Sequence, residues 1–181
     1  MRYLSFLLFV CAPIVSAQTL SLGVKGGGLF TDPAERADES QHYVVGPSLE
    51  IGFGPRVGIE VNALYSRFGA ASTGVAVRGH SVEFPVLGKF YFTDIQAAVR
   101  PYASSGFAFR NIWFDDLRSN RVGSSRINST EPAVGAVVAG GVTFKMWILK
   151  LSPEIRYTRW GGYNFPATNP NQLQGLIGIT F

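Results

Sequence analysis

Apolar and polar residues alternate at every second position in eight segments of the chain. The alternation is clearest at the C-terminus, where Leu173, Ile177, Ile179 and Phe181 share one face and mostly polar or small residues occupy the other. A period of two is that of a β-strand with one apolar face. The segments span residues 19–30, 42–53, 57–68, 80–92, 99–113, 132–144, 147–160 and 171–181.

The connections between these segments alternate in length. Three are short, at 54–56, 93–98 and 145–146, and four are long and polar, at 31–41, 69–79, 115–131 and 161–170. Each strand segment is close to the roughly 9–11 residues that a tilted membrane-crossing strand needs. Short turns at one end and long loops at the other are typical of outer-membrane barrels. The pattern therefore predicts an all-β fold, an eight-stranded antiparallel up-and-down transmembrane β-barrel.

Aromatic residues fall at both ends of the predicted strands. Amphipathic rings prefer the two interfaces of a membrane, so we expect two aromatic belts around an apolar band. The belt at the short-turn rim is predicted to contain Phe53, Phe92, Phe144, Trp147 and Phe181. The belt at the opposite rim is predicted to contain Phe30, Tyr43, Tyr65, Trp113 and Trp160.

Alternation alone does not say which face is inside, and a soluble secreted barrel or sandwich would turn its apolar face inward. Side-chain volume favours the membrane barrel, because the interior of an eight-stranded barrel is only just filled by side chains. The apolar face carries bulky residues such as Phe84, Phe90, Phe107 and Phe109, whereas the other face carries Ser, Gly, Asn and charges. We therefore expect the apolar face to meet lipid.

The charged residues of the polar face are expected to lie inside the barrel. Charges in a narrow interior are costly unless paired, so we expect one ion-pair network that plugs the barrel, with a conducting pathway as the alternative. Glu50 and Glu60 should lie opposite each other across the 54–56 turn, with Lys89 or Lys25 between them. The predicted network contains Lys25, Glu50, Glu60, Glu83, Lys89, Arg110, Lys150, Glu154 and Arg156.

The N-terminus has the pattern of a secretory signal peptide, which we expect to span residues 1–17 and to leave a barrel domain of residues 18–181. Arg2 precedes an apolar run, and Ser16-Ala17 supply small residues before the cleavage point. Cys11 leaves a lipoprotein as an alternative, but no small residue stands next to it on its N-terminal side. Removal of the signal would leave no cysteine, which excludes disulfides and Cys-ligated metals.

Other function classes have little support. The formal net charge of +4 comes without a cluster of Lys and Arg, which argues against nucleic-acid binding. The histidines are His42 and His80, both expected near the outer rim, and the adjacent His80 and Ser81 point to opposite faces of a strand. We therefore predict no enzyme activity, no cofactor and no metal. A lipid-modifying barrel enzyme remains an alternative that needs a catalytic pair.

The segment 115–131 is the longest predicted loop and contains Arg118, Arg121 and Arg126. A guanidinium group matches phosphate oxygens in a bidentate manner, so these residues are candidates for contacts with lipopolysaccharide. The alternative is a solvated loop whose arginines have no ligand.

Three motifs carry a family resemblance. VEFPVLGKFYF (82–92), Arg100-Pro101-Tyr102 and PEIRYTRW (153–160), together with the terminal Phe181, resemble small porin-like bacterial outer-membrane β-barrels. The chain is similar to the transmembrane domain of outer membrane protein A and to opacity-type proteins. The resemblance implies export to the outer membrane of a Gram-negative bacterium and recognition of the C-terminal strand by the barrel-assembly machinery. Members of this class are adhesins, structural proteins or narrow pores, so we expect a structural or surface-interaction role through the long loops, with a narrow channel as the alternative.

Overall fold

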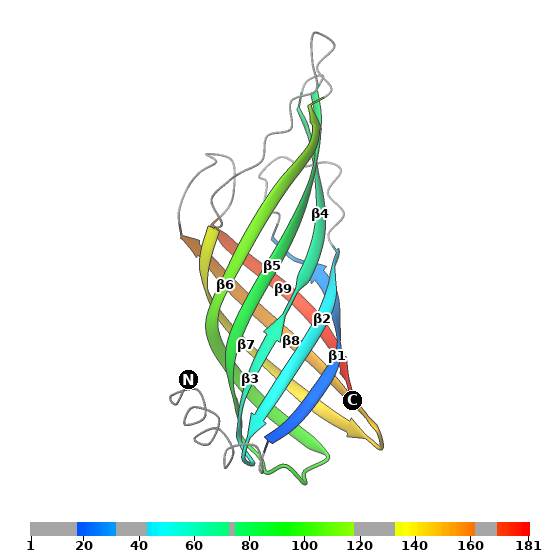
Figure 1. Cartoon of the computed structure of the whole chain (residues 1–181), viewed down its shortest axis with the longest axis vertical. Helices are drawn as coiled ribbons and strands as arrows, with labels where there is room; N and C mark the ends of the chain where they lie inside the picture. The colour runs from blue at the N-terminus through cyan, green and yellow to red at the C-terminus, as the bar shows by residue number, and fades with distance from the viewer. Residues whose placement is uncertain (1–17, 32–42, 73–74, 118–132, 162–169) are drawn as a thin grey trace, which may run out of the picture.

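The computed structural model describes residues 18–31, 43–72, 75–117, 133–161 and 170–181. These residues form a barrel of antiparallel strands, tilted against its long axis (Figure 1). Among the described residues, no helix is long and apolar enough to cross a membrane. The strands are β1 (Gln18–Leu29), β2 (Tyr43–Phe53), β3 (Val57–Asn62), β4 (Leu64–Ser72), β5 (Val75–Tyr91), β6 (Val99–Leu117), β7 (Ala133–Met146), β8 (Leu149–Gly161) and β9 (Asn171–Thr180).

The barrel closes through its first and last strands. β1 pairs antiparallel with β2 on one side and with β9 on the other, and Gly23 lies opposite Thr180. The amide of Phe181 donates to the carbonyl of Leu22 (2.9 Å), so the last residue extends this pairing. Closure gives each described strand a neighbour on both sides, as the alternation pattern predicts for a barrel.

β3 and β4 together make one barrel strand that is interrupted at Ala63, so the barrel has eight strands in all. The register with β2 is the same on both sides of the interruption, because Ser48 faces Asn62 and Val45 faces Tyr65. Continuing the register places Pro47 opposite Ala63 and Pro85 opposite Asn62. A proline has no N–H to donate to the neighbouring strand, so the regular hydrogen-bonding pattern is interrupted around Ala63.

The structure corrects the predicted loop at 69–79. β4 continues to Ser72 and β5 starts at Val75, and the two strands stay paired up to the contact between Ser72 and Val75. β6 likewise continues to Leu117, beyond the predicted strand end at residue 113. The segment 69–79 is rich in Ala and Val as well as Gly, and its β-branched residues favour paired strand over loop.

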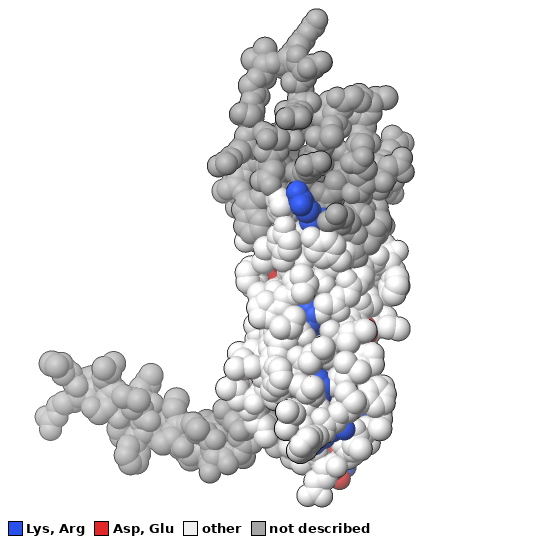
Figure 2. All heavy atoms as spheres, turned by 90° about the vertical axis from the view of Figure 1, so that its right-hand side faces the viewer, with Lys and Arg blue, Asp and Glu red and all other residues white. Residues whose placement is uncertain are grey.

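The two faces of the wall differ in polarity as the alternation predicts. Leu20, Val24 and Phe107 are among the outward residues and have 63%, 54% and 63% of their surface exposed. Lys25, Glu60 and most other described charged residues of the strands are buried inside. The face drawn in Figure 2 is accordingly mostly uncharged over its described height, with a few Lys and Arg atoms visible.

Apolar side chains occupy part of the interior as well. One buried cluster contains Leu87, Ala108, Val137 and Trp160, and a second contains Val44, Leu64 and Leu176. The interior is therefore a packed core with polar and apolar sections, as the small radius of an eight-stranded barrel requires.

Candidate functional site in the barrel interior

Glu60 on β3 is the centre of the main interior cluster. Its carboxylate accepts hydrogen bonds from Lys25 Nζ (2.5 Å), Lys89 Nζ (2.6 Å) and Arg156 Nη2 (3.3 Å). Asn62 Nδ2, two residues along the same face, donates to Glu60 Oε1 (2.8 Å). The three cations come from β1, β5 and β8, so this one carboxylate ties together strands from different sides of the barrel.

Glu154 on β8 is the second carboxylate of the same cluster. It accepts from Lys25 Nζ (2.9 Å) and from the hydroxyl of Tyr102 (2.7 Å), and its Oε1 lies 2.7 Å from Arg156 Nη2. Lys25 and Arg156 therefore each bridge Glu154 and Glu60. A Cβ atom at position 141 would lie 2.6 Å from the Tyr102 hydroxyl, so Gly141 leaves the space that this tyrosine fills.

Glu50 lies directly opposite Glu60 in the register of β2 and β3. Lys89 reaches both carboxylates, with Nζ 2.9 Å from Glu50 Oε2 and 2.6 Å from Glu60 Oε2. Tyr91 also donates its hydroxyl to Glu50 (2.7 Å). Like charges facing each other across strands repel, and the ammonium group between them offsets this repulsion.

A second polar cluster surrounds Glu83 on β5. Arg110 donates to Glu83 Oε1 through Nε (3.1 Å) and Nη2 (2.8 Å), while Gln172 and Gln174 donate at 3.0 and 3.3 Å. The guanidinium carbon of Arg110 lies 3.8 Å from the ring centre of Trp160. Trp160 in turn donates Nε1 to Gln172 (2.6 Å).

Formal charges balance within each cluster. The main cluster has three cations, Lys25, Lys89 and Arg156, against three carboxylates, Glu50, Glu60 and Glu154. The second has Arg110 against Glu83. Removal of these groups from water is compensated only by such pairing, so loss of one member would leave an uncompensated buried charge. The arrangement joins strands across the interior of the barrel.

Lys150, the remaining predicted network residue, does not join either cluster. It lies at the start of β8 and donates Nζ to Ser21 Oγ (2.6 Å). It is only partly buried, because it sits at the mouth of the barrel at the short-turn end.

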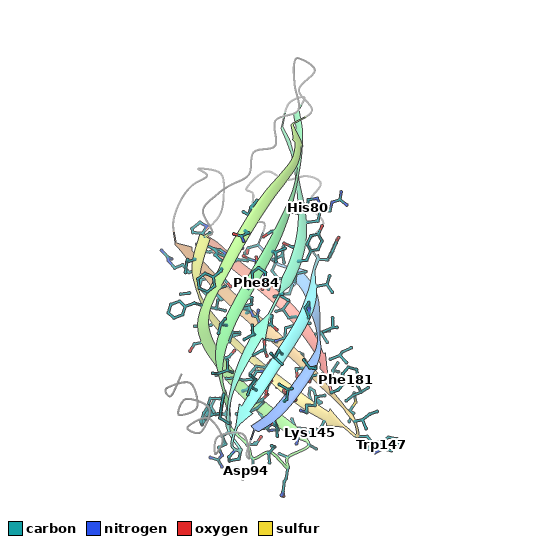
Figure 3. All side chains as sticks on the ribbon, viewed as in Figure 1. His80, Phe84, Asp94, Lys145, Trp147 and Phe181 are labelled. Atoms are coloured by element: carbon teal, nitrogen blue, oxygen red, sulfur yellow. The ribbon has the colours of Figure 1, made fainter. Side chains whose placement is uncertain are left out.

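The predicted belt at the short-turn rim faces outward. Phe53, Phe92, Phe144, Trp147 and Phe181 all have exposed side chains. Figure 3 shows Trp147 near this end, and Phe181 on the same half of the barrel.

The opposite belt needs a correction. Phe30 and Tyr43 are exposed on the outer wall, and Tyr65 stacks against His80 there, with the tyrosine hydroxyl bonded to His80 Nδ1. Trp160 is buried inside, so its assignment to the belt is wrong. The reason is strand parity: Trp160 is an even number of residues from the inward Arg156, so it projects to the same face.

Some predicted positions lie outside what the structure describes. Trp113 belongs to β6, but its side chain is outside the described residues, as are Arg118, Arg121 and Arg126. His80, expected near the outer rim, lies within β5.

Several interior residues outside the predicted network also take part in the hydrogen bonding of the two clusters. Tyr91, Tyr102, Gln172, Gln174 and Trp160 all hydrogen-bond to a carboxylate or to a residue that does. Their signal was the same parity that selected the charges, since Tyr91 follows Lys89 at an interval of two. Uncharged inward residues therefore take part in the network together with the charged ones.

The described residues contain no cluster of three or more His, Cys, Asp or Glu side chains able to hold a metal ion.

No protein-family model matches the chain, and no curated protein matches its sequence. Solved structures match its fold. Neisserial surface protein A aligns with a TM-score of 0.52 and 15% identity, covering 91% of this chain and 97% of that chain. The N-terminal β-barrel domain of Pseudomonas aeruginosa OprF gives a TM-score of 0.46 at 16% identity, covering 89% and 97%. Ail, the attachment invasion locus protein of Yersinia pestis, in complex with the heparin analogue sucrose octasulfate, gives 0.49 at 12%, covering 91% and 97%.

At these identities the likeness concerns the fold alone. The alignment with Neisserial surface protein A confirms the eight-stranded antiparallel barrel that the alternation and the family resemblance predict.

Proposed function

We propose that the chain is an integral outer-membrane β-barrel of a Gram-negative-type bacterium, exported by residues 1–17 and without enzymatic activity. The observation that carries the proposal is the inverted polarity of the wall. Leu20, Val24 and Phe107 are exposed around a core that buries Lys25 and Glu60. Exposure of such a surface to water is unfavourable, and soluble proteins rarely expose large contiguous apolar areas. Contact with lipid stabilises it.

The role that fits this barrel best is structural or surface interaction at the end opposite the short turns. The paired cluster around Glu60 fills the interior, which leaves the two ends for contacts with other molecules. At the short-turn end the connections are brief, such as the two-residue turn of Trp147 and Ile148. At the other end β1, β6 and β8 finish and β2, β7 and β9 begin (Figure 1).

Cysteine labelling in whole cells tests both the location and the orientation. After signal cleavage the mature chain has no cysteine, so Ser125→Cys and Ile148→Cys introduce single reporters at opposite ends. We expect a membrane-impermeant maleimide to label Ser125→Cys in intact cells and Ile148→Cys only after permeabilisation. Equal labelling of both in intact cells, or recovery of the chain in the soluble periplasmic fraction, would contradict the proposal.

Two partners follow from the same proposal. Arg118, Arg121 and Arg126 are proposed to contact lipopolysaccharide phosphates, and replacing all three with Ser should weaken lipopolysaccharide binding. The barrel-assembly machinery is proposed to recognise the C-terminal strand together with Phe181. Deletion of Phe181 should then lower the yield of folded protein in cells while leaving refolding in detergent nearly unchanged.

A narrow channel is the second candidate function, and one observation favours it. Within the described residues, the buried atoms Asn62 Oδ1, Arg156 Nη1 and Gln174 Oε1 have no hydrogen-bond partner. Buried polar atoms of this kind are normally satisfied by water, so these are the positions at which interior water would bind. A continuous row of water molecules through the barrel would require the ion pairs around Glu60 to separate.

A further inference from the structure

Three cationic side chains line the mouth of the barrel at the short-turn end. Arg100 lies at the start of β6, Lys145 at the end of β7 and Lys150 at the start of β8. Arg100 pairs with Thr143 in the register, and Lys145 pairs with Lys150. Their parity matches that of the buried Thr143 and Ser152, so all three belong to the inward face. Figure 3 shows Lys145 at this end, near the level of Asp94 and Trp147.

Each of these cations hydrogen-bonds only to neutral oxygens within the described part of the chain. Arg100 Nη2 donates to the carbonyl of Pro55 (2.7 Å), and Lys150 Nζ donates to Ser21 Oγ (2.6 Å). Lys145 Nζ donates to the carbonyl of Ile95. The cations deeper in the barrel differ, because Lys25, Lys89, Arg110 and Arg156 all pair with carboxylates.

The mouth therefore concentrates positive charge without compensation from the described residues. Lys145 and Lys150 face each other directly, an arrangement that is unfavourable for like charges, and Arg100 adds its charge to the field at Lys145. Arg100 is fixed in place, with only 7% of its surface exposed and its guanidinium carbon 3.8 Å from the ring centre of Tyr91. Its Nε is buried and has no hydrogen-bond partner within the described residues.

The carboxylate side chains of the described residues near the mouth already pair with other groups. Glu50 is bonded to Lys89 and to the hydroxyl of Tyr91, and Asp94 is paired with Arg56 (3.0 Å) on the exposed side of the rim. If Glu50 or Asp94 paired with the cations of the mouth, their existing ion pairs would break. An anion from outside the chain could pair with these cations and leave the existing ion pairs intact.

We propose that this mouth is a binding site for a phosphate group. A guanidinium and two ammonium groups supply charged donors from three strands, and phosphate offers several acceptor oxygens to meet them. The phosphate can belong to free inorganic phosphate or to the headgroup of an anionic lipid in the adjacent leaflet, and both present the same chemistry. The site lies at the opposite end from the long connections, so it is independent of the surface role proposed above.

Titration of the refolded mature chain with inorganic phosphate, by calorimetry in an uncharged maltoside detergent at low ionic strength, tests the site directly. We expect saturable binding, reduced about tenfold in Lys150→Gln and in Lys145→Gln because each loses one charged donor. Arg56→Gln is the matched control, since it removes one positive charge from the same rim but from a group paired with Asp94. It should bind phosphate within about twofold of the unchanged chain.

Nanodiscs distinguish the two sources of phosphate. If a lipid headgroup is the occupant, phosphatidylglycerol should raise the unfolding temperature relative to phosphatidylcholine, and Lys150→Gln should lose this gain while Arg56→Gln keeps it. If free phosphate is the occupant, binding should be the same in both lipids. Heat-dependent gel mobility establishes that each variant is folded.

Three results would overturn the proposal. The first is the absence of both saturable phosphate binding and lipid-specific stabilisation in the unchanged chain. The second is phosphate binding that survives intact in both Lys145→Gln and Lys150→Gln. The third is an equal loss in Arg56→Gln, which would show that the rim attracts anions only through its overall charge.

Discussion

Glu60 is the residue on which the interior depends most. It accepts hydrogen bonds from three cations on three strands, and it is 2% exposed. A buried charge of this kind is stabilised by its partners. When it is removed, the partners are left as buried charges without compensation, which is strongly unfavourable. The exposed pair of Arg56 and Asp94 has the same chemistry but remains in contact with water, so its contribution is small.

Glu60→Gln is expected to lower the free energy of unfolding by about 3–5 kcal/mol, because Lys25, Lys89 and Arg156 lose a shared counter-charge. Asp94→Asn, which breaks the exposed pair, should cost no more than about 1 kcal/mol. Urea titrations followed by tryptophan fluorescence in lipid vesicles measure both values. Similar losses for the two variants would show that the interior pairing is not what holds the barrel together.

At the scale of single elements, β7 combines two neighbouring glycines with different surroundings. A Cβ at Gly141 would meet Pro153 O at 2.5 Å and the Tyr102 hydroxyl at 2.6 Å, whereas a Cβ at Gly140 would meet only Tyr102 O at 3.8 Å. Gly141 therefore makes room on the inner face for the hydrogen bond between Tyr102 and Glu154. Gly140 is exposed on the outer face and has no such role.

Gly141→Ala should destabilise the barrel by about 1–3 kcal/mol, because Tyr102 or the backbone of β8 has to move. Gly140→Ala is the matched control and should change stability by less than about 0.5 kcal/mol. The same urea titration reports both. Indistinguishable stabilities would mean that the interior around Tyr102 is loose enough to absorb a methyl group.

The outer wall of β5 gives a second test at this scale. Val86 is exposed on the outer face midway between His80 and Phe92. If the wall meets lipid, Val86→Arg should cost about 2–4 kcal/mol in vesicles, and Phe92→Arg at the rim about 0–1 kcal/mol. A water-exposed wall predicts small effects at both positions, so equal and small losses would exclude the membrane assignment.

Strand alternation predicts most of the fold, because a period of two assigns each side chain to the inner or outer face without further information. It places Glu50 opposite Glu60 and Lys89 on the same face, and the structure brings these groups into contact. The aromatic character of Trp160 favours the belt, but its parity places it on the inner face. The small residues near the end of β4 are compatible with a loop in composition, and only their pairing with β5 extends the strand to Ser72.

Other features have no signal in a single sequence. The apolar clusters around Leu87 and Leu176 depend on which inward residues meet across the barrel, and only the closed register determines this. The cluster of Arg100, Lys145 and Lys150 at the mouth cannot be predicted from the sequence for the same reason, since these residues come from three strands. Arg100 and Lys145 also stand at strand ends, where alternation is hardest to assign.

At the scale of the whole molecule, the fold is an eight-stranded barrel whose interior charges are paired with one another. The wall exposes apolar residues along its height, and the interior satisfies Lys25, Lys89, Arg110 and Arg156 with carboxylates. An eight-stranded barrel leaves little space beyond its side chains, which supports the proposal that balanced ion pairs and buried leucines together plug it. The function proposed for such a molecule lies at its two ends.

Conductance of the refolded mature chain in a planar lipid bilayer tests this account most directly, with heat-dependent gel mobility as the control for folding. A closed interior predicts no discrete current steps from the folded protein, and the appearance of steps in Glu60→Gln, whose pairing is broken. Reproducible steps from the unchanged chain would contradict the plug and establish the interior as a conducting path.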